Sequence, residues 1–156
     1  MGLFKALFGE PVKENKMPFM IEDQDGIKKK LNQKFGLAIH FKMWDEFNRN
    51  DIEDNENEKI ICVENSFPLN GVIGTVILTD SRLIFTDGSK GNTKVVKYSD
   101  IKRKNNKFDV IIFGNTITIN LISGSRTFQT SDWQGDELTA KNLLDTANRL
   151  IPYLSV

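Results

Sequence analysis

One short stretch, GTVILTDSRLIFTDG at residues 74–88, constrains the fold more than any other part of the chain. It holds two apolar triplets, residues 76–78 and 83–85, on either side of the polar tetrapeptide TDSR. Two short apolar runs around so small a polar break predict a β-hairpin with Asp80 and Ser81 at the turn, because short polar side chains stabilise tight turns. The chain is therefore expected to build an antiparallel sheet around this hairpin.

Further short apolar runs, separated by turn residues, predict five more strands. In residues 116–122 the alternation is clean, with Ile117, Ile119 and Leu121 on one face and polar side chains on the other. The preceding Gly114–Asn115 suits a type II′ hairpin turn. Seven short strands argue for a barrel or sandwich, because an open sheet of that length would expose long edges. The strands predicted outside the opening hairpin cover residues 60–67, 93–101, 108–113, 116–122 and 126–130.

The pattern changes to a helical period from Asp136 onward. Asp132 or Asp136 can cap the start of this helix, and Pro152 ends it. A single amphipathic helix after seven strands is expected to bury its apolar stripe against the sheet or across a barrel mouth. The predicted stripe comprises Leu138, Leu143, Leu144, Ala147, Leu150 and Ile151.

Seven strands closed by one C-terminal helix resemble the pleckstrin-homology (PH) plan. Residues 78–85, LTDSRLIF, and residues 98–101, YSDI, resemble the bacterial PH-like proteins of the YokE-like and GRAM-like type. This resemblance covers about residues 57–152 and implies a mainly β (α+β) fold, a partly open seven-stranded barrel capped by the C-terminal helix. PH domains that bind phosphoinositides carry clustered basic residues between their first two strands. Here that loop, NSFPLNGVIG at residues 65–74, has none, so the resemblance does not bring such a site to this chain.

The chain before the barrel divides into two segments. Residues 1–20 form an oily tip and a Pro-containing linker, and residues 21–58 form a helical extension that ends in an acidic, Asn-rich loop. Asp25 is the predicted cap of a helix that begins at residue 26 or 27. Residues 59–156 then form the PH-like barrel with its helix. The helix of the extension is expected to bury Ile27, Leu31 and Phe35 on one face and to stop at Gly36.

No set of residues predicts an enzyme. Cys62 is the only cysteine and His40 the only histidine, and each lies between apolar neighbours. We therefore expect both to be packed residues, with no metal site, no cofactor and no catalytic group. A lone cysteine also suits a reducing compartment such as a cytoplasm. No stretch approaches the length of a transmembrane helix.

Charged and oily clusters give candidate contact sites. The chain carries 21 basic and 21 acidic residues, so bulk charge does not favour nucleic acid. Two basic groups could contact anions or lipid, although solvation of a strand end or a helix face explains them as well. Arg82 is expected to form an exposed local pair with Asp80 or Asp100. The basic candidates are Lys97, Lys102, Arg103, Lys104, Lys107, Lys28, Lys29 and Lys30, and the candidate docking residues of the oily tip are Leu3, Phe4, Leu7 and Phe8.

The sequence therefore predicts a cytoplasmic binding or scaffolding module without enzymatic activity, acting through a protein partner or self-association. The alternative is a peripheral membrane sensor that meets anionic lipid through the oily tip and the basic helix. That alternative requires the tip and the lysines at residues 28–34 to lie on one side of the molecule.

Overall fold

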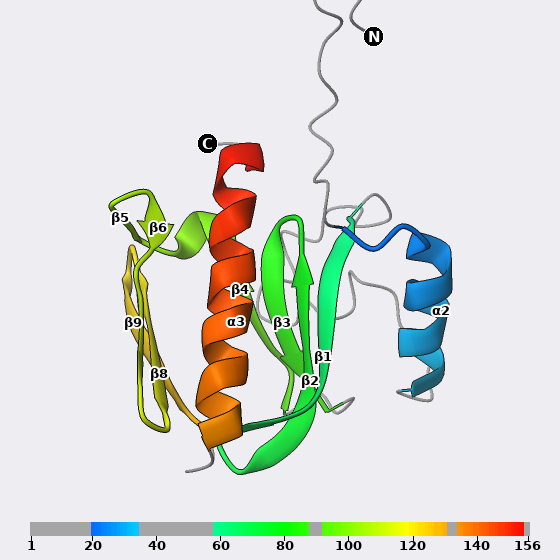
Figure 1. Cartoon of the computed structure of the whole chain (residues 1–156), viewed down its shortest axis with the longest axis horizontal. Coiled ribbons are helices and arrows are strands. Elements are labelled where there is room, and N and C mark those ends of the chain that lie inside the picture. The colour runs from blue at the N-terminus through cyan, green and yellow to red at the C-terminus, as the bar shows by residue number, and fades with distance from the viewer. Residues whose placement is uncertain (1–19, 35–57, 88–91, 131–133, 155–156) are drawn as a thin grey trace, which may run out of the picture.

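The protein is described by a computed structural model that covers residues 20–34, 58–87, 92–130 and 134–154. Its strands form three antiparallel sheets, of four, two and three strands. The C-terminal helix α3 (Gln134–Leu150) lies over the opening between the two larger sheets (Figure 1). The barrel is not closed, because no strand of the four-stranded sheet continues as a ladder into the three-stranded sheet. This mainly β arrangement with a C-terminal helix confirms the predicted PH-like fold.

The predicted hairpin forms the centre of the four-stranded sheet. The sheet runs in the order β1 (Ile60–Leu69), β2 (Val72–Thr79), β3 (Arg82–Thr86) and β4 (Lys94–Lys97). The last β2–β3 pair of the ladder joins Leu78 to Leu83, which leaves Asp80–Ser81 at the turn. The sequence prediction of this hairpin is confirmed.

Both faces of the central hairpin are buried, which explains why its apolar triplets do not alternate with polar residues. Val76, Leu78 and Phe85 belong to a main cluster between the sheets and α3, whereas Ile77 and Ile84 face a second cluster on the other side. A strand buried on both faces reads as a continuous apolar run. The buried residues of the main cluster are Ile61, Phe67, Leu69, Val76, Leu78, Phe85, Val96, Tyr98, Ile101, Phe108, Ile119, Phe128, Ala140, Ala147 and Leu150.

Helix α2 (Gln24–Lys34) covers the second cluster (Figure 1). Leu31 is buried there, as predicted, and packs with Ile60, Ile77, Ile84 and Val95. The side chain of Gln24 accepts from the backbone N–H of Ile60 at 2.6 Å and donates to its carbonyl at 2.8 Å, so the helix start is bonded to β1.

The cap of α2 differs from the prediction. The helix begins at Gln24, and the backbone N–H of Gly26 donates to Oδ1 of Asp23 at 2.9 Å, so Asp23 and not Asp25 is the N-cap. Gly26 permits this cap, because a Cβ at that position would lie 2.1 Å from Oδ2 of Asp23. Phe35 and Gly36, which belonged to the predicted face and stop, lie outside the described residues.

The connection between β1 and β2 is shorter than the ten-residue loop predicted at 65–74. Strand β1 continues to Leu69, and the turn consists only of Asn70 and Gly71, with φ angles of 52° and 82°. Two successive left-handed residues are the mark of a type I′ hairpin, which Asn-Gly favours. The β1–β2 register shifts between Glu64 and Phe67, where Ser66 has a φ of 59°. The strand runs two residues beyond its predicted end at Phe67, through Pro68, which reads as a loop residue.

The three-stranded sheet contains β7 (Val110–Phe113), β8 (Thr116–Leu121) and β9 (Gly124–Gln129). Ile119 is buried and Ile117 and Leu121 pack against the main cluster, which confirms the predicted inward face of β8. Gly114 has a φ of 59°, as the first central residue of the predicted turn requires.

The segment between the two larger sheets is more broken than the predicted strand over 93–101. Strand β4 ends at Lys97, and the 3₁₀ turn η5 (Tyr98–Asp100) follows it. A short hairpin follows, made of two strands of two residues each, β5 (Arg103–Lys104) and β6 (Lys107–Phe108). Tyr98 begins the 3₁₀ turn η5, with its ring buried in the main cluster and its hydroxyl donating to the carbonyl of Thr79 at 2.8 Å.

Helix α3 buries most of its predicted stripe. Leu150 is fully buried, Leu143, Leu144 and Ala147 pack in or against the main cluster, and the 3₁₀ turn η6 (Ile151–Tyr153) follows. Leu138 is 61% exposed, so its place in the stripe was wrong. At about 100° per residue, the nine residues from Leu138 to Ala147 place them on opposite sides of the helix.

The predicted caps of α3 have different outcomes. Asp136 is the third residue of the helix and not its cap. Asp132 lies outside the described residues.

Candidate functional site

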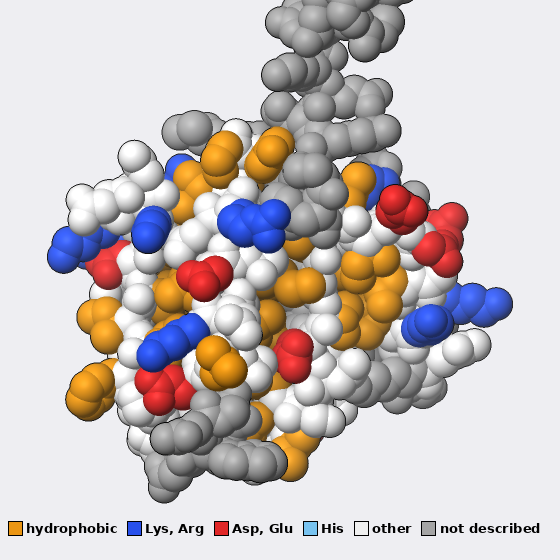
Figure 2. Space-filling model, in the orientation of Figure 1, with side chains coloured by type: hydrophobic (Ala, Val, Ile, Leu, Met, Phe, Trp, Pro, Cys, Tyr) orange, Lys and Arg blue, Asp and Glu red, His pale blue; other side chains and the backbone are white. Residues whose placement is uncertain are grey.

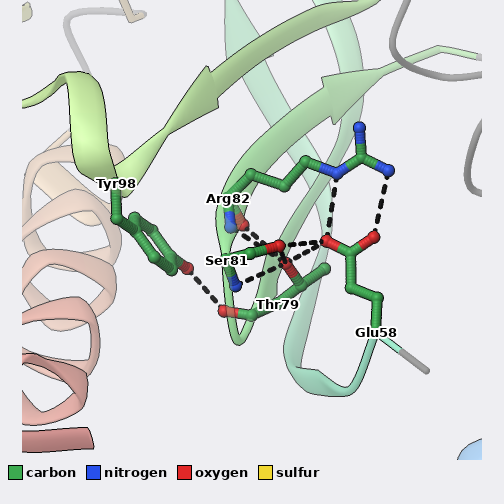
Figure 3. Close-up of polar contacts among 5 residues, drawn as sticks. All are labelled: Glu58, Thr79, Ser81, Arg82 and Tyr98. Atoms are coloured by element: carbon green, nitrogen blue, oxygen red, sulfur yellow. Dashed lines mark hydrogen bonds and ion pairs between the residues drawn. The ribbon is translucent and has the colours of Figure 1, made fainter. Parts of the chain in front are cut away.

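The turn of the central hairpin is held by one buried carboxylate. Glu58 accepts from Arg82 in a bidentate pair, with Nε to Oε2 and Nη2 to Oε1 both at 3.0 Å (Figure 3). Oε2 also accepts from the hydroxyls of Ser81 at 2.8 Å and Thr79 at 2.5 Å. Thr79 Oγ1 in turn accepts from the backbone N–H groups of Ser81 and Arg82. Three of the four residues of the TDSR turn thus contact a single side chain.

This geometry corrects the prediction for Arg82. Its side chain is only 3% exposed and pairs with Glu58, not with Asp80 or Asp100. A buried charged pair is tolerated where further hydrogen bonds satisfy its atoms, as the two hydroxyls do here. We read the Glu58 network as a structural element of the fold, because its carboxylate is already occupied and buried.

No catalytic group emerges from the part of the chain that the structure describes. Cys62 is half-buried against the main cluster, and burial, with repulsion from Glu64, raises the pKa of its thiol to about 11. A thiol with so high a pKa is a poor nucleophile at neutral pH. Within the described ranges, no three His, Cys, Asp or Glu side chains lie close enough to hold a metal ion. His40 lies outside them.

The basic run between β4 and β7 forms a projecting hairpin. Asn105 and Asn106 have left-handed φ angles of 54° and 62° and make its turn, and Lys104 pairs directly with Lys107 across it. The guanidinium of Arg103 lies 5.8 Å from the ring centre of Phe108. We call the four exposed side chains at Lys102, Arg103, Lys104 and Lys107 the cationic hairpin; Lys97 is only partly exposed on β4.

The structure does not bring the two predicted basic groups together. Lys28, Lys29 and Lys30 lie on α2, at the opposite end of the long axis from the β5–β6 hairpin (Figure 1). Lys29 and Lys30 are exposed, and Lys28 is partly buried. On the face shown in Figure 2, acidic and basic side chains are interspersed, with no broad field of one sign. The tip residues Leu3, Phe4, Leu7 and Phe8 lie outside the described residues.

Strand β7 carries a further surface feature, which the sequence did not predict. Strand β7 is a four-residue apolar run whose side chains alternate between partly buried and exposed. Val110 and Ile112 pack against the main cluster, whereas Ile111 and Phe113 are 56% and 82% exposed. We call the latter two side chains the β7 patch. Because all four residues of VIIF are apolar, the sequence does not indicate which of them face outward.

The ladder partners of the β7 patch are uncharged. Ile111 lies beside Thr118 and Phe113 beside Thr116 in the β7–β8 ladder, and Thr118 lies in turn beside Thr127 of β9. Among the described strands, β7 pairs with β8 alone, so its other edge has no ladder partner there. The patch therefore combines exposed apolar side chains with a strand that has one ladder partner among the described strands, although α3 also contacts β7.

Comparison with known proteins gives structural neighbours only. No protein-family model matches the chain, and no curated protein matches its sequence. One similar solved structure is described as the Vps36 N-terminal PH domain, with 15% identity, coverage of 62% of this chain and 84% of that one, and a TM-score of 0.44. Another is the C-terminal domain of an unknown protein from Leishmania infantum, with 15% identity, coverage of 77% and 96%, and a TM-score of 0.43.

One observation bears on membrane insertion. Within the described ranges, no helix combines the length and the apolar character needed to cross a bilayer.

Proposed function

We propose that this protein is a non-enzymatic binding module that recognises a protein partner through the β7 patch. The observation that carries the proposal is the 82% exposure of Phe113 on a strand that has a ladder partner on one edge only among the described strands. Exposed aromatic side chains are enriched where proteins bind one another. A free edge also offers backbone donors and acceptors to an incoming strand.

The arrangement favours an extended segment as the partner. Side chains of an added strand alternate between the two faces of the sheet, so every second residue would lie beside Ile111 and Phe113. These two side chains, with the threonines at 116 and 118, offer apolar and β-branched surface without charge. We therefore expect a partner segment with apolar or aromatic residues at alternate positions.

Other features agree with a binding module and not with a phosphoinositide receptor. The two-residue turn Asn70–Gly71 leaves no basic loop between β1 and β2. A single cysteine suits a reducing compartment, and we include a cytoplasmic location in the proposal. The finer resemblance to YokE-like and GRAM-like bacterial proteins rests on residues 78–85 and 98–101, and we keep it as part of the proposal.

The proposal is tested by selecting binders from a displayed library of random peptides against the full chain. Selected peptides should carry apolar residues at alternate positions, and the double variant Ile111→Thr/Phe113→Ser should lose at least tenfold in affinity for them, since an aromatic hot spot contributes about 2 kcal/mol. Ile73→Thr is the matched control, because Ile73 is a 70% exposed strand residue away from β7. Equal affinity for all three proteins would contradict the proposal.

A second candidate function rests on the cationic hairpin. Like charges directly opposite each other, as at Lys104 and Lys107, destabilise a bare hairpin, and an anion would relieve that repulsion. The hairpin could therefore hold the molecule on an anionic membrane surface.

Flotation with vesicles that contain or lack phosphatidylserine tests this candidate. If the hairpin is the contact, Lys104→Glu/Lys107→Glu abolishes flotation with anionic vesicles, and the matched change Lys29→Glu/Lys30→Glu on α2 leaves it intact. The reverse pattern would favour the basic helix of the extension. No flotation of the parent protein would remove both membrane versions.

A further inference from the structure

A cavity of about 90 Å³ lies inside the barrel, between the two larger sheets and α3. Its walls include Phe85 and Val96 from the four-stranded sheet, Ile112 and Ile117 from the three-stranded sheet, and Ala147 from the helix. One water needs about 10–15 Å³ of such space, so the cavity has room for several non-hydrogen atoms.

The interior of the cavity is apolar. Tyr98 lines it with its ring, because its hydroxyl is turned to the carbonyl of Thr79 at 2.8 Å. The remaining lining side chains are aliphatic or aromatic, with the single exception of Lys94. A water molecule inside would find few hydrogen-bond partners, and cavities of this kind stay dry and accept apolar ligands.

Lys94 places one positive charge at the cavity. It pairs with the inward-facing Phe85 across the β3–β4 ladder, so it lies on the cavity side of the sheet, and it is partly exposed. Within the described residues, no hydrogen bond or ion pair engages its ammonium group. Arg126, by contrast, donates to the carbonyl of Val95 at 3.2 Å and stacks over Phe128.

We propose that this cavity binds a small carboxylate with a short alkyl chain, with the chain inside and the carboxylate at Lys94. The apolar walls select the hydrocarbon part through burial of its surface. The ammonium at the rim selects a negative head group that remains in contact with water. The volume suits a short chain, so we commit to a soluble carboxylate and not to the long acyl chain of a membrane lipid.

Titration calorimetry of the full chain with butanoate, whose three-carbon chain suits the cavity volume, tests the proposal. We expect saturable binding of one butanoate, and binding of 1-butanol weakened about fivefold by loss of the exposed ion pair. Lys94→Gln should weaken butanoate binding by the same factor and leave 1-butanol binding unchanged. Lys97→Gln is the matched control, because Lys97 lies on the same strand but on the opposite face.

A second variant tests the cavity itself. Ala147→Leu fills the space from α3 and should reduce the affinity for both ligands at least tenfold, with the circular dichroism spectrum unchanged. If that variant does not fold, Ala140→Val from the same helix replaces it. Absence of butanoate binding, or a butanoate affinity unchanged by the filling variant, would overturn the proposal. Binding to phospholipid vesicles without binding of butanoate would show that the ligand is a membrane lipid and not a soluble carboxylate.

Discussion

At the scale of single residues, the Glu58–Arg82 pair is the contact with the largest expected effect on stability. Both side chains are 3% exposed, so each charge depends on the other for compensation. Changing Glu58→Gln leaves the guanidinium buried without a counter-charge, and we expect it to lower the free energy of unfolding by about 3–5 kcal/mol. Urea unfolding monitored by fluorescence measures this change.

The exposed pair between Glu137 and Lys141 on α3 supplies the matched control. Its atoms are 2.9 Å apart, but the lysine is half exposed. Glu137→Gln should therefore change stability by no more than about 0.5 kcal/mol. A Glu58→Gln variant as stable as the Glu137→Gln variant would show that the buried pair does not hold the hairpin turn.

The carboxyl group of Asp80 at the same turn should make the stability of the fold depend on pH. Burial raises the pKa of Asp80 above its ordinary 3.8; a hydrogen bond from the backbone of Lys59 opposes this shift, and repulsion from Glu58 adds to it. The native state therefore binds this proton more tightly than the unfolded chain does, and its contribution to stability is present at low pH and lost as pH rises through the native pKa.

Asp80→Asn removes the loss of stability that ionisation of Asp80 causes, because the asparagine amide stays neutral as the pH rises. We expect the variant to unfold at a higher urea concentration than the parent at pH 7, and the difference to shrink toward zero below the ordinary pKa of 3.8. Urea unfolding over a pH series measures both. A variant less stable than the parent at neutral pH would contradict this account of the turn.

Among single residues, contacts between sequence neighbours were predictable and contacts between distant residues were not. The Asp80–Ser81 turn was predictable, because it depends on neighbouring residues alone. The partner of Arg82 was not, because Glu58 is 24 residues away and stands at the end of an acidic run that reads as a solvated loop. Asn70–Gly71 carried a local hairpin signal that the nearby proline and serine obscured.

At the scale of elements, helix α3 packs against the main cluster through one of its faces. Leu150 is fully buried in the main cluster and Leu138 is 61% exposed, although both were placed in the same predicted apolar stripe. Leu150→Ala should cost about 2–5 kcal/mol, the usual loss for truncation of a core leucine. Leu138→Ala should change the free energy of unfolding by less than about 0.5 kcal/mol. Equal losses in denaturant melts would mean that α3 does not pack in the orientation described.

The strands differ in how well their buried face can be predicted from the sequence. The alternating strand β8 was predicted with its inward face because polar and apolar residues take turns along it. The all-apolar strand β7 gave no such information, since both of its faces carry similar side chains. The candidate binding surface therefore became visible only when the structure placed Ile111 and Phe113 outside the core.

At the scale of the whole molecule, two layers of packing surround the four-stranded sheet. The main cluster fills the space toward α3, and α2 covers the opposite face through Leu31. This arrangement leaves the three-stranded sheet as the layer whose outer face carries the β7 patch. Self-association through the oily tip, weakened by deletion of residues 1–10, remains a separate prediction from the sequence.

The most direct test of the central claim is a map of amide chemical shifts on the full chain as a selected peptide is added. We predict that the largest changes fall on β7, at residues 110–113, and on its neighbour β8, because the partner is proposed to lie against that edge. Changes concentrated on the cationic hairpin or on α2, with β7 unaffected, would contradict the claim that the β7 patch is the binding surface.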